Sequence, residues 1–212
     1  MPIPCRMKLM IEDAVAHLSK QEPLAALIAR IELPVRQPSG KMYYDLLESI
    51  VSQQLSVRVA DVIFHRFLAL FPDTYPHPDQ LSCISMEQLR SAGLSAQKAQ
   101  YLRNVAQFAL EQGLESQDWQ SMTDEQIIRY LTQIKGVGVW TVQMLLMFTL
   151  GRPDVFPVDD LGIQQGMARL FKIQDTGKAL KRTMIELAEP WRPYRTTACY
   201  YLWRYKSMPR FS

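Results

Sequence analysis

Residues 123–150 read TDEQIIRYLTQIKGVGVWTVQMLLMFTL, and this stretch decides the fold. It begins with a capping box, in which Thr123 caps a helix and Gln126, three residues later, completes the reciprocal hydrogen bonds. Apolar residues then follow at helical spacing as far as Ile134. The pattern predicts a helix that begins after Thr123 and ends at Ile134.

A glycine turn, Gly136-Val137-Gly138, breaks that helix, and a second helix is expected from about Val139 to Leu150. Glycine adopts backbone angles that are barred to other residues and lets another backbone approach closely. The amides of such a turn point outward at the positive end of the second helix, where they can bind a phosphate without a basic side chain. Gly136, Val137 and Gly138 are therefore predicted to contact a DNA phosphate, which fixes the position of the duplex but reads no bases. A plain helical hairpin is the alternative.

The rest of the chain also reads as helices separated by turns, which predicts an all-α fold. Prolines and glycines mark the ends of the segments. The only candidate strand is a short piece at residues 155–158. Outside the hairpin, helices are expected at residues 11–18, 23–31, 43–51, 57–71, 86–92, 96–112, 159–171, 176–189 and 196–205.

The helix expected at residues 57–71 follows Ser56, a candidate N-cap. Pro72, Pro76 and Pro78 are expected to end it, and no helix is predicted between them and residue 86. Apolar residues at helical spacing predict its inward face, which consists of Val59, Val62, Ile63, Phe67 and Leu70.

Composition limits the class of protein. The 212 residues allow one large domain or two small lobes. The three cysteines, Cys5, Cys83 and Cys199, lie far apart, which argues against a disulfide framework, an iron–sulfur cluster and a metal-ligand cluster. The chain shows no signal-peptide pattern and no apolar run of about 18 residues, so no membrane association is expected. The expected location is the cytoplasm or nucleoid of a bacterium, or the nucleus of a eukaryote.

The net charge of +3 is unevenly distributed. Residues 1–161 carry 14 Lys or Arg against 18 Asp or Glu, whereas residues 162–212 carry 10 against 3. This asymmetry suggests that a polyanion faces the C-terminal part, although a solvated helical surface is the alternative. Basic residues there are expected to help hold phosphates, including Arg192, Arg195, Arg204 and Lys206.

A second informative stretch is Phe156-Pro157-Val158-Asp159-Asp160. An aspartate at the start of a helix is most often an N-cap. Together with the hairpin, however, this stretch resembles the helix–hairpin–helix/Gly-Pro-Asp superfamily of DNA glycosylases, and within it the 3-methyladenine DNA glycosylase II group. The resemblance runs from about Ala14 to Tyr205, in a compact form without the N-terminal β-domain of some larger relatives. Further matching segments are Ile50–Ser56, Gly93–Ala99, Trp191–Arg195 and Tyr201–Trp203.

The resemblance implies that Asp159, directly after Pro157-Val158, is the catalytic carboxylate, with Asp160 as a rival. Breaking an N-glycosidic bond builds positive charge on the sugar, which a fixed carboxylate stabilises while it activates the attacking water. Trp140 stands where bifunctional relatives have a lysine that attacks the sugar, and an indole cannot form a Schiff base. The implied enzyme is a hydrolase of N-glycosyl compounds in base excision repair, without lyase activity.

The resemblance places Trp140, Met144, Trp203 and Gln53 at positions that line the pocket for a flipped base. An electron-rich indole stacks well on a base that carries positive charge. The expected substrates are therefore alkylated bases of the 3-methyladenine and 7-methylguanine type. Core packing is the alternative for Trp140, Met144 and Trp203.

By the same resemblance, Gln54 stands at the wedge position that fills the hole left by the flipped base. Leu55 could plug the hole instead, and an ordinary loop is the alternative for both. The backbone carbonyls of Ile134 and Val137 are implied to hold a monovalent cation that bridges to a phosphate. No other cofactor is expected.

Two helical lobes are expected around a DNA-binding cleft, with Asp159 at their junction. One lobe would hold residues 1–35 and 163–212, and the other residues 45–150. A monomer that acts on double-stranded DNA with damaged bases is predicted. The rival functions are a uracil or mismatch glycosylase of the same fold and a non-enzymatic helix–hairpin–helix DNA-binding protein.

Overall fold

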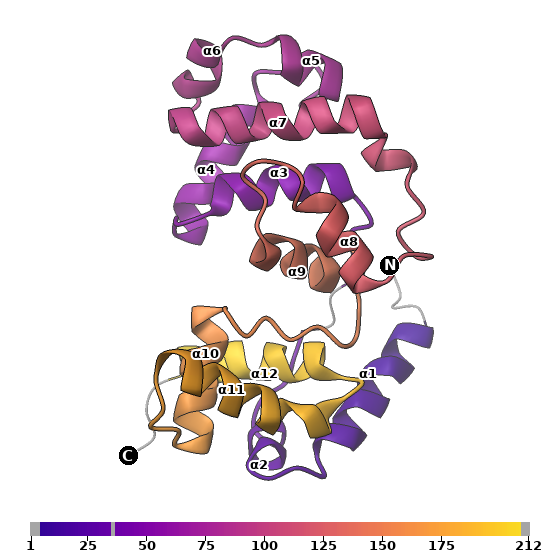
Figure 1. Ribbon diagram of the computed structural model, residues 1–212, viewed down its shortest axis with the longest axis vertical. Helices are drawn as coiled ribbons and strands as arrows, with labels where there is room; N and C mark the ends of the chain where they lie inside the picture. The colour runs from indigo at the N-terminus through magenta and orange to yellow at the C-terminus, as the bar shows by residue number, and fades with distance from the viewer. Residues whose placement is uncertain (1–4, 35–36, 209–212) are drawn as a thin grey trace. The chain divides into compact units, whose positions relative to one another are not determined.

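The computed structural model describes residues 5–34 and 37–208, with side chains from residue 11 onward. All regular structure in these ranges is helical, which confirms the all-α prediction (Figure 1). None of the described helices is long and apolar enough to cross a membrane. The helices are α1 Cys5–Leu18, α2 Leu24–Ile28, α3 Met42–Ser52, α4 Val57–Leu68, α5 Pro78–Cys83, α6 Met86–Ser91, α7 Ala96–Gln112, η1 Leu114–Ser116, α8 Asp124–Leu131, α9 Val139–Phe148, α10 Leu161–Phe171, α11 Gly177–Ala188, η2 Glu189–Trp191 and α12 Arg195–Ser207.

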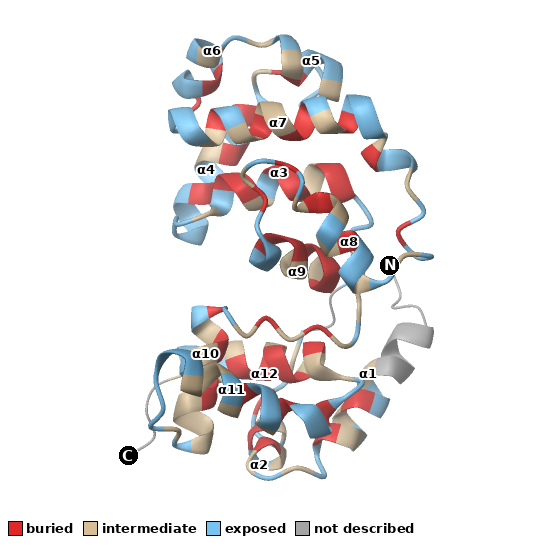
Figure 2. Cartoon of the chain, viewed as in Figure 1, coloured by how far each residue is buried: buried red, intermediate tan, exposed pale blue. Residues whose placement is uncertain are grey.

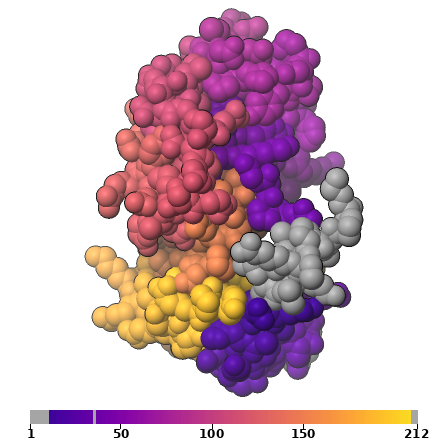
Figure 3. Space-filling model, turned by 90° about the vertical axis from the view of Figure 1, so that its right-hand side faces the viewer, coloured from indigo at the N-terminus to yellow at the C-terminus, as the bar shows by residue number. Residues whose placement is uncertain are grey.

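The chain divides into two compact units. Unit 2 is the continuous stretch Pro38–Leu150, and unit 1 combines the described residues of Met1–Gln37 with those of Gly151–Ser212. Segments from both ends of the chain therefore meet in unit 1, where the space-filling view shows indigo and yellow surfaces side by side (Figure 3). Unit 1 includes residues 151–162, which the expected lobes left out. Residues 1–4 and 35 of the expected lobe lie outside the described residues.

Unit 2 is built around α3, which packs against α4, α7 and α9. α5 and α6 pack on α7, and α8 packs on α9. Buried residues occur on all these helices and are drawn in red in Figure 2. The buried residues of α3 are Met42, Tyr43, Leu46, Leu47, Ile50 and Val51. Because so much of α3 is buried, its C-terminal end is held firmly beside α9.

α4 buries only part of the face that its apolar spacing predicts, because Phe67 is buried and Ile63 and Leu70 are partly buried. The predicted core residues Val59 and Val62 are 44% and 46% exposed, whereas Ala60 and Phe64 are buried. Phe64 packs edge-on against Tyr44 of α3, with ring centroids 5.3 Å apart. A phenyl ring removes more apolar surface from water than a valine does, so the aromatic residues determine which face is buried.

α5 is a helix that the sequence pattern did not predict, because three nearby prolines indicated a loop. Pro78 occupies the first turn of this helix. At that position the missing amide hydrogen costs no hydrogen bond, and the fixed φ of proline suits a helix. Leu81 then anchors α5, which packs on α7.

Unit 1 is centred on α12, which packs against α1, α2 and α10, while α11 packs on α10. α10 and α12 approach closely at Gly166, where a Cβ atom would lie 2.9 Å from the carbonyl oxygen of Leu202. Residues 155–158 form an irregular loop rather than the candidate strand. This loop leads directly into α10 and carries the two aspartates of interest.

Candidate functional site

The turn between α8 and α9 is longer than the sequence pattern predicts. α8 has the predicted capping box but ends at Leu131 rather than at Ile134. Thr132 donates its hydroxyl back to Ile128 O at 2.7 Å, and Ile134 N donates to Leu131 O at 3.1 Å. Such local bonds compete with the regular helical pattern. Ile134 is therefore part of the turn, not of the helix.

Gly136 is needed for the packing of this turn. Its φ of 108° is a conformation that other residues rarely adopt, and a Cβ atom there would lie 2.3 Å from Tyr101 Cγ on α7. Asn104, also on α7, donates its Nδ2 to Lys135 O at 3.0 Å. One side of the turn is thus held by α7.

Gly138 is placed differently, at the exposed N-terminus of α9. Its φ of −98° suits any residue, and a Cβ atom there would meet nothing within 4 Å. The first amide of α9 that bonds back to the turn is Val142 N, which donates to Gly138 O at 3.1 Å. The preceding amides form the positive end of the helix, next to Val139 and Trp140, which are 48% and 40% exposed. This end of the hairpin is open to a phosphate of an approaching duplex.

A pocket of about 530 Å³ is lined by residues of α3, α9 and the segments next to them. It contains Trp140, Met144, Gln53, Gln54 and Leu55, so the structure brings together most of the predicted pocket and wedge residues within unit 2. The remaining lining residues are Ser39, Asp45, Glu48, Ser49, Ser52, Leu145, Phe148 and Thr149.

The charged side chains of this pocket are both acidic. Asp45 accepts hydrogen bonds from Ser39 and, at 2.6 Å, from Thr149 Oγ1. Partial burial, and then the charge of Asp45, raise the pKa of Glu48 above its usual value. No lysine or arginine is among the described residues that line the pocket. The pocket therefore favours a positively charged ligand over an anion.

The loop after α3 is held in an unusual conformation. Gln54 has a φ of 59°, which is uncommon for a residue other than glycine. Gln53 Nε2 lies 3.5 Å from Gly136 O and 3.4 Å from Thr141 Oγ1, so its side chain is tied to the hairpin. Lys98 of α7 donates from Nζ to Val51 O and to Gln53 O, both at 2.7 Å. Burial lowers the pKa of Lys98. Lys98 therefore caps the end of α3 and positions the loop.

In unit 1 the structure separates the two neighbouring aspartates. Asp160 is the N-cap of α10, and its Oδ1 accepts from Ile163 N at 2.8 Å. The same oxygen accepts from Trp203 Nε1 at 2.8 Å. Gly162 makes room for this contact, because a Cβ atom there would lie 2.8 Å from Trp203 Cδ1. Asp160 is thus buried and committed to the structure of α10.

Asp159 is the exposed member of the pair, with 58% of its side chain accessible. Its carboxylate forms an ion pair with Lys181 Nζ of α11. Of the two candidate carboxylates, Asp159 is the one that a substrate can reach, and Asp160 has the structural N-cap role that either residue could have had. This favours Asp159 as the reactive carboxylate.

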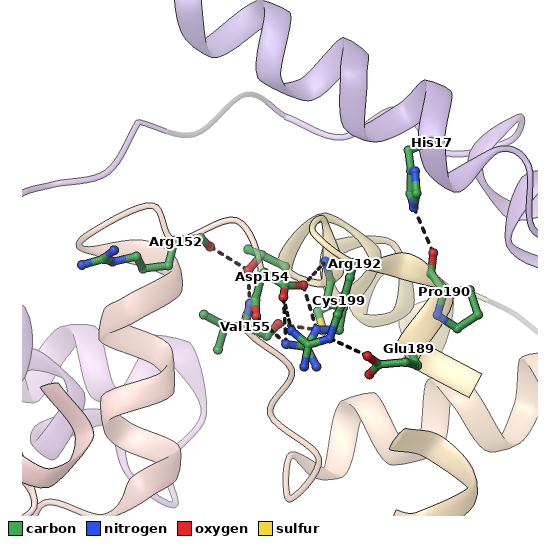
Figure 4. A network of polar contacts seen from close by, with 10 residues as sticks. His17, Arg152, Asp154, Val155, Glu189, Pro190, Arg192 and Cys199 are labelled. Atoms are coloured by element: carbon green, nitrogen blue, oxygen red, sulfur yellow. Dashed lines mark hydrogen bonds and ion pairs between the residues drawn. The ribbon is translucent and has the colours of Figure 1, made fainter. Parts of the chain in front are cut away.

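Asp154 anchors the loop that leads to Asp159, in the network shown in Figure 4. Arg195 Nε donates to Asp154 Oδ1 at 2.7 Å, and Arg192 Nη1 donates to Asp154 Oδ2 at 2.6 Å. Thr196 fixes the backbone on both sides, accepting from Val155 N at 3.0 Å and donating to Arg152 O at 2.7 Å. Both guanidinium groups are engaged with this loop, and the Arg192 side chain is still 49% exposed, so the predicted phosphate contacts of Arg192 and Arg195 stay a prediction.

Trp203 does not line the pocket of unit 2; it lies in unit 1 against Asp160 and Gly162. The sequence interpretation also missed two lysines that act on predicted site residues. Lys98 was noted only as part of a matching segment, and Lys181 had no motif around it. Lys98 and Lys181 contact groups that are distant in sequence, so local spacing could not predict the partner of either lysine.

The turn carbonyls are chemically suited to the implied monovalent cation. Ile134 O and Val137 O belong to one turn, which the bond from Val137 N to Ile134 O closes at 3.0 Å. Neutral carbonyl oxygens suit a hard cation, whereas no cluster of three or more His, Cys, Asp or Glu side chains exists among the described residues.

Comparison with known proteins assigns a family to this arrangement. The family model described as "HhH-GPD superfamily base excision DNA repair protein" matches residues 47–193. A curated relative named DNA-3-methyladenine glycosylase 1, from Schizosaccharomyces pombe, is 36% identical over 165 residues, which cover 76% of this chain and 71% of that protein. A Bacillus subtilis relative is 34% identical over 169 residues, and the chain spans 58% of its length.

A solved structure supports the same relationship. The Schizosaccharomyces pombe 3-methyladenine DNA glycosylase Mag1, in complex with abasic DNA, superimposes with a TM-score of 0.79 at 34% sequence identity. The match covers 91% of this chain and 95% of that chain.

Proposed function

The chain belongs to the HhH-GPD superfamily of base excision DNA repair proteins, and from that premise we propose that it is a monofunctional DNA glycosylase that removes alkylated bases from duplex DNA. The substrates are bases of the 3-methyladenine and 7-methylguanine type. The relatives named above as 3-methyladenine glycosylases support this assignment. The observation that carries it is the placement of Asp159, which is exposed beside a neighbour that performs the structural N-cap role.

The reaction breaks the bond between C1′ of the deoxyribose and the ring nitrogen of the base. The bonding electron pair leaves with the base, and the sugar develops positive charge that the Asp159 carboxylate stabilises. Water then adds to C1′, and its proton passes to Asp159 and on to solvent. An alkylated base is a good leaving group because it already carries positive charge, so no strong acid is required in the pocket.

The pocket of unit 2 supports the choice of substrate. Trp140 and Met144 offer apolar contact surface to a flipped base, and the indole face attracts a cationic ring. Glu48 and Asp45 give the pocket a negative field. A neutral base gains less from both features than a methylated, cationic one.

Trp140 also supports the absence of a lyase step. It occupies the first turn of α9, and its indole nitrogen cannot attack C1′ to form a Schiff base. The described residues that line the pocket include no lysine. With tryptophan in place of the attacking lysine of bifunctional relatives, the expected product is an intact abasic strand.

The hairpin and the loop after α3 supply the binding steps. The N-terminal amides of α9 hold a backbone phosphate, and a monovalent cation at Ile134 O and Val137 O would strengthen that contact. Gln54 or Leu55 enters the duplex in place of the flipped base. The protein acts as a monomer and needs no organic cofactor. Its location is the compartment of the cell that contains the DNA.

The test is base release from methylated duplex DNA, with free 3-methyladenine and 7-methylguanine quantified by chromatography. The wild type should release both and leave the strand uncut, and Asp159→Asn should lower the rate at least about 100-fold while it still binds DNA. Release of uracil or of mismatched bases alone would overturn the alkylbase assignment. DNA binding without any base release would indicate a non-enzymatic DNA-binding protein.

A further inference from the structure

We propose that Lys181 is a phosphate-binding residue that masks Asp159 in the DNA-free protein and transfers to a phosphate beside the flipped nucleotide when DNA binds. The inference rests on the proposed function and adds to it a positioning residue on α11. It turns the ion pair into a device that exposes the reactive carboxylate only in the complex with DNA.

The starting point is the environment of Asp159. Among the residues that the structure describes, Lys181 is the one ion-pair partner of its carboxylate. Both side chains are accessible, at 44% for Lys181 and 58% for Asp159. The lysine comes from a different helix, so its four-carbon stem can swing away without disturbing the turn that carries Asp159.

A second carboxylate in the same unit shows the contrast. Asp154 is held by Arg192 and Arg195, and only 21% of its side chain is accessible. Two guanidinium groups with several hydrogen bonds make a permanent anchor. One exposed ammonium makes a weak pair that another anion can replace. The chain thus uses a permanent pair for the loop and an exchangeable pair for the reactive group.

Electrostatics explains why the pair must open. A carboxylate stabilises positive charge on the sugar through its own negative charge, which an ammonium in contact with it largely cancels. A paired Asp159 is therefore a poor catalyst. The deoxyribose that faces Asp159 in a productive complex carries a phosphate on each side, so a phosphate is an anion available to a lysine that contacts Asp159. Transfer of Nζ to one of these phosphates restores the charge of Asp159 and adds one contact to the DNA.

The experiment compares the wild type with Lys181→Gln and Lys181→Arg. Lys178→Gln is the matched control, because it removes one exposed positive charge from the same helix without touching Asp159. Affinity for a duplex with a non-hydrolysable abasic analogue is measured by fluorescence anisotropy at several salt concentrations. Base release is measured separately under single-turnover conditions with saturating enzyme.

Lys181→Gln should bind about fivefold to tenfold more weakly at 0.1 M salt, and its slope of log affinity against log salt should be smaller by about 0.9. The single-turnover rate at saturation should equal or exceed that of the wild type, because the masking pair is absent. Lys181→Arg should restore the slope, and Lys178→Gln should change the affinity and the slope less than Lys181→Gln does.

A neutral methylphosphonate at each of the two phosphates beside the lesion locates the partner. At one of the two positions, the methylphosphonate should lower the DNA affinity of the wild type to that of Lys181→Gln. It should not lower the affinity of Lys181→Gln further, as expected for two groups that contact each other. Additive losses at both positions would overturn the proposal.

Two further results would also overturn it. One is an unchanged salt slope in Lys181→Gln. The other is a large fall in the single-turnover rate of Lys181→Gln, which would mean that Lys181 supports Asp159 instead of masking it. In that case, a covalent complex that borohydride traps with the wild type but not with Lys181→Gln would identify the amine of Lys181 as the nucleophile. Because the binding measurements need no base release, they remain decisive even if the proposed glycosylase activity fails.

Discussion

Two adjacent aspartates of identical chemistry have separate tasks here. Asp160 accepts from a backbone amide and from Trp203 Nε1 and is buried, whereas Asp159 projects outward to Lys181. The difference arises because Asp160 occupies the N-cap position of α10, whereas Asp159, one residue earlier, lies outside the helix with its side chain in solvent. Stability and activity should therefore respond to different members of the pair.

Replacing Asp160 should lower stability, and replacing Asp159 should not. Asp160→Ala removes an N-cap and the acceptor of Trp203, with a combined cost of about 2 kcal/mol. For a chain of this size that corresponds to a fall in Tm of roughly 4–8 °C. Asp159→Asn should keep the wild-type Tm within about 1 °C, because an exposed ion pair contributes little. Thermal unfolding followed by circular dichroism measures both. Equal losses of Tm in the two variants would contradict the division of roles.

Lys98 should matter for both the stability of unit 2 and the loop beside the pocket. Lys98→Met leaves the carbonyls of Val51 and Gln53 without its two hydrogen bonds, at a cost of about 2 kcal/mol. Base release should fall further than the Tm alone explains, since the conformation of Gln54 depends on this loop. Lys98→Arg is the charge-conserving control, and full activity of the methionine variant would show that the loop needs no clamp.

The lowered pKa of Lys98 gives this variant a pH signature. Burial lowers the pKa of Lys98 in the folded chain, so the unfolded chain keeps the proton up to a higher pH than the folded chain does. The contribution of Lys98 to the free energy of unfolding therefore rises with pH in the alkaline range below 10.5. The difference in Tm between the wild type and Lys98→Met should widen from about pH 8 to about pH 10. A constant difference would show that burial does not perturb this lysine.

At the scale of elements, the hairpin combines a rigid side and an open side. Gly136 is fixed against Tyr101, whereas Gly138 is the N-cap of α9 and a Cβ atom there would meet nothing within 4 Å. Helix prediction succeeded for α7, whose bounds agree fully, failed for α5, and was correct for only part of the face of α4. α7 has an N-cap serine and a C-terminal glycine, so local signals define it, whereas the inward face of α4 depends on where the rings of unit 2 meet.

Substitution by alanine should affect stability at one hairpin glycine and DNA binding at the other. Gly136→Ala places a methyl group against Tyr101 in a disfavoured backbone conformation, which should cost about 2–4 kcal/mol and lower the Tm. Gly138→Ala should leave the Tm within about 2 °C but weaken DNA binding about tenfold, because the methyl group obstructs an approaching phosphate. Melting curves and binding isotherms together decide the point. Unaltered binding by Gly138→Ala would remove the hairpin from the DNA interface.

At the scale of the whole molecule, the continuous unit 2 carries the hairpin and the pocket, and unit 1, formed from both ends of the chain, carries Asp159. Residues 38–150 contain 8 Lys or Arg and 11 Asp or Glu, so this unit is acidic, and the positive charge lies in residues 162–212. On the proposed function, we therefore expect unit 2 to contact the flipped base and the basic segment of unit 1 to supply the electrostatic attraction to DNA.

A fragment of residues 38–150 tests this division. It should unfold cooperatively, because its buried residues form a core of their own around α3. It should bind duplex DNA at least about tenfold more weakly than the full chain at 0.1 M salt and release no base, since the basic segment and Asp159 are absent. A fragment that binds as tightly as the full chain would show that the C-terminal charge is irrelevant to affinity.

Local sequence signals determined the helical class, the capping box and the glycine turn, because capping, helical periodicity and turn chemistry depend on residues only a few positions apart. The candidate aspartates came from the resemblance to a known family. Tertiary structure alone decided which aspartate is the cap, which face of α4 is buried, and which partners Lys98, Lys181 and Trp203 have. These outcomes depend on contacts between residues distant in the chain, where the packing of rings and the reach of long side chains select among locally equivalent arrangements.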